Sequence, residues 1–193
     1  TPRDHAFVAV RSSATAEDLP SASFAGQQAT FVNVLGKENV VVAVQKCWAS
    51  LFTARAIYYR VKNNYPHMKV AIAVIVQKQI NSDASGVTFS INPATNNLDQ
   101  VVIEAIYGLG EAVVAGEVNP NTYILDKKTG NVVEKDIPVQ NFYLTRDAYT
   151  GQTVKRNLGK DKQKQQVLTE GQIKFLYKIA LKVESHYGVP QDM

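Results

Sequence analysis

Residues 8–26 read VAVRSSATAEDLPSASFAG, and this stretch decides most of what the sequence implies about the fold. The short, mostly apolar run His5–Val10 predicts a strand. The residues that follow, Arg11–Gly26, are small and rich in hydroxyl groups, and they show neither a helical period nor a strand alternation. We therefore expect a loop there, followed by another short strand at Thr30–Val34.

The Arg11–Gly26 loop is a first candidate for chemistry. It combines one arginine with five hydroxyl side chains: Ser12, Ser13, Thr15, Ser21 and Ser23. Hydroxyl and backbone N–H groups hydrogen-bond to phosphate oxygens, and arginine adds a bidentate, charge-assisted contact. The composition favours an ordinary polar surface loop about as much as it favours a phosphate site, so both interpretations stay open.

Glu38–Asn63 has the clearest helical pattern of the chain. Apolar residues recur at steps of three and four and form one face: Val41, Val44, Trp48, Leu51, Tyr58 and Val61. Arg55 falls within this stripe, where a guanidinium needs a carboxylate, phosphate or carbonyl partner. Cys47, on the same helix, is expected to pack as a small hydrophobic side chain.

The following segment contains strand patterns. The unbroken apolar run Val70–Val76, which ends at Gln77, predicts a strand buried on both faces. Gly86–Ile91 alternates apolar and polar residues and predicts a half-buried strand. With the turn Asn81–Asp83 between them, these two strands are expected to pair as a hairpin.

The rest of the chain adds strands and one well-marked helix. We expect a strand at Gln100–Ile106 and a hairpin formed by Thr122–Leu125 and Asn131–Glu134. Thr169 and Gln172 form a capping box ahead of an apolar stripe that ends near Gly188 and Pro190. Together these elements predict an α+β domain over residues 1–193, with a mixed or antiparallel sheet, packed helices and no internal linker.

The net charge of +4 suggests a nucleic-acid partner, but its location argues against one. Thr145–Gln166 holds six basic and two acidic residues, so this one stretch carries the whole excess of four. We expect a solvated, mobile loop there, and a basic nucleic-acid-binding domain is the non-enzymatic alternative.

Composition also limits the class of protein. A single cysteine excludes an internal disulfide. No apolar run reaches the ~18 residues of a membrane span, and residues 1–5 contain no apolar signal region. We therefore expect a cytoplasmic protein without a membrane partner.

Gly108-Leu109-Gly110-Glu111, followed by Gly116, is a second candidate for chemistry. The glycine spacing does not fit a dinucleotide-binding fingerprint, so a tight turn and a close approach of phosphate remain equally open. Glu111 is a candidate to assist a metal or to pair with a cation. The three histidines have no metal-ligand spacing, and no metal ligand is assigned.

Three sequence blocks together resemble one known family. They are residues 8–20 with 22–28, residues 85–90, and residues 108–114 with Gly116 and 118–120. They resemble the nucleotide-binding domain shared by phosphoenolpyruvate synthase (pyruvate, water dikinase), pyruvate, phosphate dikinase and rifampicin phosphotransferase. The resemblance spans nearly the whole chain. It implies an ATP-grasp-type fold in which ATP and Mg²⁺ are held between two lobes.

The resemblance also implies roles for individual residues. Arg11 matches a phosphate-contacting arginine, and Arg55 matches an arginine near the phosphates, so both are expected to act in catalysis. Gly26 and Thr30 lie where the family's glycine-rich loop meets ATP, and Gln77 matches a nucleotide contact. A further nucleotide contact is expected at Glu111, in the glycine-rich turn. Asn121 replaces an aspartate that is usual after the Asn-Pro pair, which weakens any role for that position.

The activity implied by the resemblance is that of phosphoenolpyruvate synthase. Family enzymes transfer the β-phosphoryl group of ATP to a histidine on a separate, swivelling domain, and the synthase then converts pyruvate to phosphoenolpyruvate, with AMP and phosphate as the other products. Residues 1–193 would be the larger part of the ATP-binding domain. The family's upstream lysine, its downstream metal-binding glutamate and Gln-x-Arg motif, and the histidine and pyruvate domains are expected outside them. We expect no turnover of pyruvate by these residues alone. Rifampicin phosphotransferase and pyruvate, phosphate dikinase are the alternatives within the family.

Overall fold

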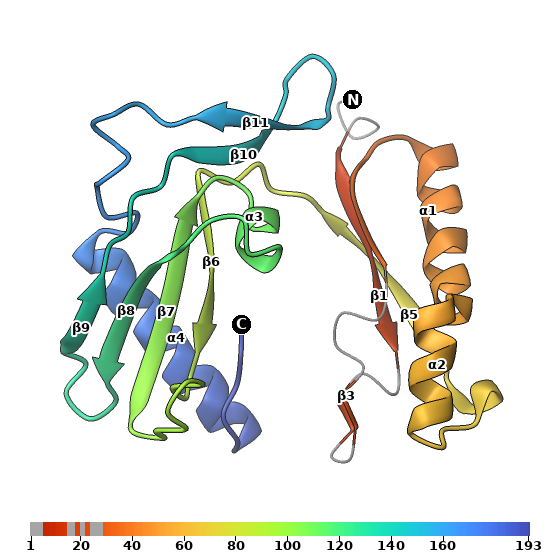
Figure 1. Cartoon of the computed structure of the whole chain (residues 1–193), viewed down its shortest axis with the longest axis horizontal. Helices are drawn as coiled ribbons and strands as arrows, with labels where there is room; N and C mark the ends of the chain where they lie inside the picture. The colour runs from red at the N-terminus through yellow and green to blue at the C-terminus, as the bar shows by residue number, and fades with distance from the viewer. Residues whose placement is uncertain (1–5, 15–17, 20–21, 24–28) are drawn as a thin grey trace. The chain divides into compact units, whose positions relative to one another are not determined.

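The computed structural model describes residues 6–14, 18–19, 22–23 and 29–193. The chain divides into two compact units, Thr1–Ile80 and Asn81–Met193, and each has antiparallel sheets and a hydrophobic core of its own. The expected α+β class with antiparallel sheets is confirmed (Figure 1). No shift in composition along the sequence indicated the division at residue 80.

The first unit is built on a three-stranded antiparallel sheet. Its central strand β1 (Val8–Ala14) lies between β4 (Thr30–Val34) and β5 (Ile72–Lys78). Two very short strands, β2 (Asp18–Leu19) and β3 (Ala22–Ser23), pair with each other. The helical elements are α1 (Lys37–Ala49), the 3-10 turn η2 (Ser50–Phe52), α2 (Ala54–Lys62) and the 3-10 turn η3 (His67–Lys69).

The loop expected at Arg11–Gly26 is wrong in its first part. Residues 11–14 continue β1, because they pair with β5 along their whole length. Pairing satisfies the backbone N–H and C=O groups, and this outweighs the weak strand preference of a serine-rich segment. Residues 15–17, 20–21 and 24–28 of the expected loop lie outside the described part of the chain.

The expected hairpin between the strands on either side of Asn81–Asp83 is also wrong. β5 pairs with β1, whereas β6 (Ala84–Phe89) pairs with β7 (Gln100–Tyr107) in the second unit. Nor is β5 buried on both faces, since Ile75 and Val76 remain 47% and 49% exposed. β5 is an edge strand, so its apolar run is covered only in part.

The single helix expected over Glu38–Asn63 is broken at η2 and restarts at Thr53, whose hydroxyl caps α2. Most of the expected apolar stripe faces outward on both sides of the break: Val41 and Trp48 on α1 and Tyr58 and Val61 on α2 are each more than half exposed. The face that packs on the sheet is formed instead by Val40, Ala43, Val44 and Cys47. The interior position of Cys47 is confirmed, and burial raises the pKa of its thiol.

The second unit is a four-stranded antiparallel sheet in the order β6-β7-β8-β9, with β8 at Asn121–Asp126 and β9 at Val132–Asp136. Helix α4 (Glu170–Tyr187) packs on one face of it, where Ile173 and Ala180 are buried against β7 and β8 (Figure 1). The expected β8–β9 hairpin, the capping box of α4 and its end at the left-handed Gly188 are all confirmed.

The second unit also contains the short helix α3 (Glu111–Val114) and a separate hairpin, β10 (Phe142–Arg146) with β11 (Thr153–Asn157). The loop expected over Thr145–Gln166 is therefore wrong for β11, which pairs with β10 over five residues. Lys155 of β11 lies 3.5 Å from the centre of the Phe142 ring, a cation–π contact that helps to order the basic strand.

Among the described residues, no single helix is long and apolar enough to cross a membrane. The segments Lys37–Phe52 and Ala54–Lys62, bent by 41°, meet that length and composition requirement only as a pair.

Candidate functional site

Three candidate residues of the first unit lie on the face of the β4-β1-β5 sheet that is turned away from α1. Val10 points toward α1, where Cys47 contacts its carbonyl oxygen. Side chains alternate along a strand, so Arg11 points to the opposite face. The register pairs Arg11 with Thr30 on β4 and with Ile75 on β5, which places those side chains on the same face.

Gln77 joins Arg11 on this face, two residues beyond Ile75 on β5. The guanidinium Nη1 of Arg11 donates a hydrogen bond to the side-chain oxygen of Gln77 over 3.4 Å. Arg11, Thr30 and Gln77 are all exposed. The structure thus brings three predicted residues together and offers a cation, a hydroxyl and an amide on one open surface. These groups are suited to binding the oxygens of a phosphate chain.

The structure places the other predicted residues differently. Gly26 lies outside the described residues. Arg55 lies in the first turn of α2 and is exposed. Glu111 is half-buried and begins α3 in the second unit. The structure therefore groups Arg11, Thr30 and Gln77 on one face, and the roles of all six residues stay predictions.

The arginine that needs internal partners is Arg60, not Arg55. Arg60 is 1% exposed, and it donates to the carbonyl oxygen of Leu51 over 2.5 Å and to Nδ1 of His67 over 2.9 Å. The expected apolar surroundings of Arg55 are therefore wrong: Arg55 is exposed, and the buried guanidinium lies five positions further along the chain. The buried arginine ties α2 to η2 and η3.

Two amide side chains that the sequence analysis did not predict link the strands at one end of the first sheet. Gln79 accepts a hydrogen bond from the backbone N–H of Asn33 at 2.5 Å, and its own amide donates to the side-chain oxygen of Asn33 at 2.8 Å. Asn33 has a φ of 56° beside a register shift between β1 and β4. Asparagine tolerates this left-handed conformation better than most residues. That preference is the one feature of the sequence that pointed to an irregular backbone at Asn33.

The glycine-rich turn of the second unit is a tight turn held by hydroxyl groups. Gly108 has a φ of 84°, and its carbonyl oxygen accepts hydrogen bonds from Ser82 and Ser85. A Cβ on Gly108 would collide with the backbone carbonyl of Leu144. The tight turn is confirmed, and a close approach of phosphate to it stays a prediction.

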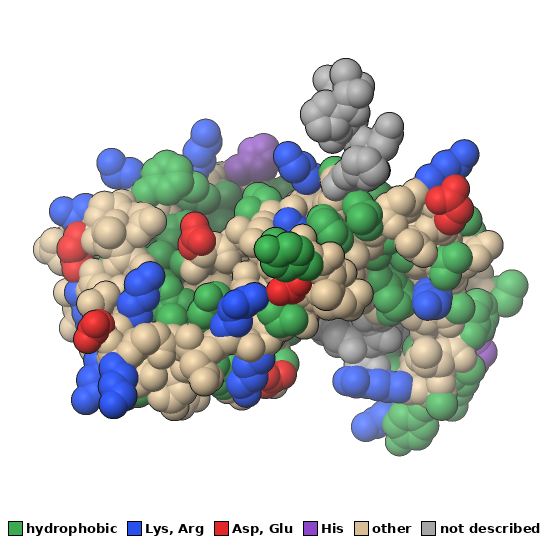
Figure 2. Space-filling model, turned by 90° about the horizontal axis from the view of Figure 1, so that it is seen from above, with side chains coloured by type: hydrophobic (Ala, Val, Ile, Leu, Met, Phe, Trp, Pro, Cys, Tyr) green, Lys and Arg blue, Asp and Glu red, His purple; other side chains and the backbone are tan. Residues whose placement is uncertain are grey.

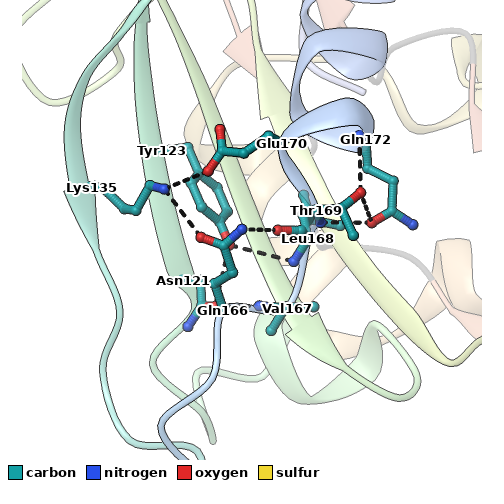
Figure 3. Close-up of polar contacts among 9 residues, drawn as sticks. All are labelled: Asn121, Tyr123, Lys135, Gln166, Val167, Leu168, Thr169, Glu170 and Gln172. Atoms are coloured by element: carbon teal, nitrogen blue, oxygen red, sulfur yellow. Dashed lines mark hydrogen bonds and ion pairs between the residues drawn. The ribbon is translucent and has the colours of Figure 1, made fainter.

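Asn121 has a structural role. Its side-chain oxygen accepts a hydrogen bond from the backbone N–H of Val167 at 2.8 Å and from the hydroxyl of Tyr123 at 3.3 Å. Burial raises the pKa of Tyr123. Figure 3 shows these contacts beside the ion pair of Lys135 with Glu170 (2.8 Å). Together they fix the start of α4 against β8 and β9.

The described residues contain no cluster of three or more His, Cys, Asp or Glu side chains that would hold a metal. A protein-only magnesium site is therefore not supported by these residues.

The basic side chains do not gather into a single patch on the face drawn in Figure 2, where Lys and Arg are interspersed with acidic, apolar and polar groups. Arg156 is paired with Asp147 at 3.1 Å. The described residues on this face therefore form no continuous cationic track for a nucleic acid backbone.

Comparison with known proteins identifies the family. Residues 2–193 match the family model described as "Pyruvate phosphate dikinase, AMP/ATP-binding domain". A protein of Methanocaldococcus jannaschii named "Probable phosphoenolpyruvate synthase" is 52% identical over 98% of this chain and 16% of its own length. The "Phosphoenolpyruvate synthase" of Pyrococcus furiosus is 48% identical over 99% of this chain and 24% of its own length.

A related phosphotransferase is nearly as similar. The "Rifampicin phosphotransferase" of Bacillus cereus is 46% identical over 98% of this chain and 21% of its own length. The chain spans between 16% and 27% of the length of curated relatives that it matches. The family match extends over both structural units, and the chain belongs to the pyruvate phosphate dikinase AMP/ATP-binding domain family.

Proposed function

We propose that this chain is the ATP-binding part of a phosphoenolpyruvate synthase with an ATP-grasp-type fold. The observation that carries the proposal is the exposed group of Arg11, Thr30 and Gln77 on one sheet face, in a chain that belongs to an AMP/ATP-binding family. The whole enzyme would phosphorylate a histidine on another domain of the same protein. It would convert pyruvate, ATP and water to phosphoenolpyruvate, AMP and phosphate.

In this proposal the chain positions ATP and neutralises charge. Phosphoryl transfer demands little covalent chemistry from the protein and depends on orientation and on stabilising negative charge. Arg11 donates hydrogen bonds to phosphate oxygens, and Gln77 holds the guanidinium in place through the 3.4 Å contact. The hydroxyl of Thr30 adds a donor on the same face. A bound Mg²⁺ would supply further neutralisation of the phosphates.

The test is a calorimetric titration of the full-length enzyme with ATP and Mg²⁺. We expect Arg11→Ala to weaken ATP binding about tenfold or more, because a charge-assisted hydrogen bond contributes about 1.5–3 kcal/mol. Arg156→Ala, which removes an exposed guanidinium from the second unit, is the matched control and should bind ATP as the unaltered enzyme does. Equal affinities of Arg11→Ala and the control would overturn the assignment.

The choice of reaction has its own test. The full-length enzyme should consume ATP in a pyruvate-dependent manner, whereas residues 1–193 alone should not. Consumption of ATP that depends on rifampicin instead of pyruvate would favour the second candidate, which rests on the 46% identity to the Bacillus cereus enzyme.

A further inference from the structure

The second unit contains a polar pocket on the side of its sheet that carries α4. It lies where the end of β7, the hairpin β10–β11 and the first turn of α4 meet, and its volume is about 540 Å³. Figure 1 shows β10 and β11 running across the end of β7. Tyr107, which lines the pocket, shares its face of β7 with Ile103 and Ala105, and these two pack against α4. Small-molecule sites commonly have volumes of about 300–1,000 Å³, so the pocket has the size of a ligand site.

Hydrogen bonds within the second unit hold the walls of this pocket in place. The side-chain oxygen of Asn81 accepts from the backbone N–H of Arg146 at 3.1 Å and from the hydroxyl of Thr145 at 3.4 Å. These contacts join the segment before β6 to β10. The hydroxyl of Tyr107 donates to the carbonyl of Gln166 at 3.3 Å. A site whose walls are held before the ligand arrives loses less conformational entropy on binding.

Several polar groups on these walls have no partner among the described residues. They are the carboxylate of Asp83, the ammonium of Lys162, the hydroxyl of Tyr143 and the amide N–H groups of Asn81 and Gln172. The oxygens of both amides are already engaged, that of Gln172 in the capping box of α4. The pocket therefore offers more donors than acceptors, with one charge of each sign.

The balance of charge restricts the class of ligand. Among the described residues that line the pocket, Asp83 is the one carboxylate and Lys162 the one cation. A polyanion such as a nucleoside triphosphate would meet a like charge and a single cation there, and like charges in close contact are unfavourable. A molecule with one anionic and one cationic group satisfies both side chains.

The pocket also has an apolar part. Because side chains alternate along β10, Phe142 and Leu144 pack in the core beside Ile106, whereas Tyr143 faces the pocket. The rings of Tyr143 and Tyr107 lie among its walls, and aromatic rings pair favourably with one another. A cavity of about 150 Å³ holds a benzene ring, so a volume of about 540 Å³ has room for an aromatic side chain beside two charged groups.

We propose that this pocket binds a free α-amino acid with an aromatic side chain. The ammonium group of the ligand pairs with Asp83, its carboxylate pairs with Lys162, and its ring lies against Tyr107 and Tyr143. All the residues that line the pocket belong to the second unit, whereas the residues proposed to contact the phosphates of ATP belong to the first.

The first test is a calorimetric titration of the full-length enzyme with L-phenylalanine. Asp83→Asn and Lys162→Met should each weaken binding about five- to tenfold, because each removes one charged contact with the ligand. Lys160→Met and Asp161→Asn are the matched controls, since both residues are exposed neighbours of Lys162 that do not line the pocket. The controls should bind as the unaltered enzyme does. Absence of binding to the unaltered enzyme, or equal losses in the controls, would overturn the proposal.

The second test uses ligands that lack one charge. L-Phenylalaninamide has no carboxylate and N-acetyl-L-phenylalanine has no ammonium group. Lys162→Met should therefore not weaken binding of the amide any further, and Asp83→Asn should not weaken binding of the acetyl compound any further. Effects of the same size on all three ligands would overturn the proposal, because they would show that neither side chain contacts the group assigned to it.

Titration with ATP and Mg²⁺ separates the pocket from the proposed ATP contacts. Asp83→Asn and Lys162→Met should bind ATP with the affinity of the unaltered enzyme. Weaker binding of ATP by either variant would assign the pocket to the nucleotide and would overturn the proposal.

Discussion

At the scale of single residues, the side chain of Arg60 fixes the position of α2 in the first unit. Its guanidinium is buried and donates to Leu51 and His67, and it lies 5.9 Å from the centre of the Phe52 ring. Burial of a charge is costly unless its donors are satisfied, so these contacts are required for α2 to lie where it does. The guanidinium of Arg55 is exposed, so its removal should change the stability of the fold little.

A pair of variants separates these two arginines. Arg60→Met should lower the free energy of unfolding by about 1–3 kcal/mol, because the buried carbonyl of Leu51 loses its donor. Arg55→Met should change it by less than about 0.5 kcal/mol, since the side chain is exposed. Denaturant unfolding measures both. Equal loss of stability would contradict the assignment of Arg60, and not Arg55, as the arginine with internal partners.

Gly108 is the second position where a single residue is decisive. It combines a φ of 84° with a close approach of the Leu144 backbone. Gly108→Ala should destabilise the second unit by more than the ~1–2 kcal/mol that a left-handed conformation alone costs. Gly116→Ala is the control, since Gly116 has a φ of 69° but no neighbour within 4 Å. Similar unfolding free energies for the two variants would contradict the close approach.

At the scale of elements, an ion pair at the first turn of α4 adds to the apolar packing that docks this helix. The ammonium of Lys135 on β9 hydrogen-bonds the carboxylate of Glu170, which lowers the pKa of Glu170 below its ordinary value. A lowered pKa of a carboxyl group stabilises the fold at pH values above its unfolded pKa. That contribution is lost as pH falls through the folded pKa.

Lys135→Met tests this linkage. The variant should be less stable than the unaltered protein near pH 7, and part of the difference should disappear as pH falls below about 4. NMR titration should find a higher pKa for Glu170 in the variant. The contact of Lys135 with Gln166 at 3.1 Å does not titrate, so some difference should persist in acid. A difference independent of pH would assign the whole effect to that neutral contact.

At the scale of the whole molecule, the two units have separate cores. Val10 is fully buried in the first, with Ala43 and Cys47, and Ile103 is 1% exposed in the second, with Tyr123 and Leu125. A cavity in one core removes contacts only within that core. Separate cores predict that each unit has a stability of its own.

Core variants test this independence through hydrogen exchange. Ile103→Ala should cost the second unit about 2–5 kcal/mol and speed exchange of amides in β7 and β8, with those of β1 and β5 unchanged. Val10→Ala should produce the opposite pattern. Faster exchange in both units after either substitution would mean that they unfold together.

Predictions that depended on residues close together in the sequence were confirmed, and those that depended on distant contacts were not. The capping box and apolar stripe of α4 and the β8–β9 hairpin depend on residues close together in the sequence, and all were confirmed. The extent of β1, the partner of β5 and the break near Ser50 were not predicted. Each depends on contacts between distant residues, such as the pairing of Arg11 with Ile75. Local patterns do not encode such pairings.

For the candidate site, too, the sequence indicated the residues and the structure their arrangement. The block beginning at Val8 and its resemblance to one family were sufficient to identify Arg11, Thr30 and Gln77 as candidates. The sequence by itself also determined the family, the α+β class and the final helix, because motifs, periodicity and caps are local properties. Only the tertiary structure decided that Arg11, Thr30 and Gln77 share one face, that Arg60 is the buried arginine and that β6 pairs with β7 and not with β5. Strand register and helix phase set those outcomes, and both are determined by which distant surfaces pack together.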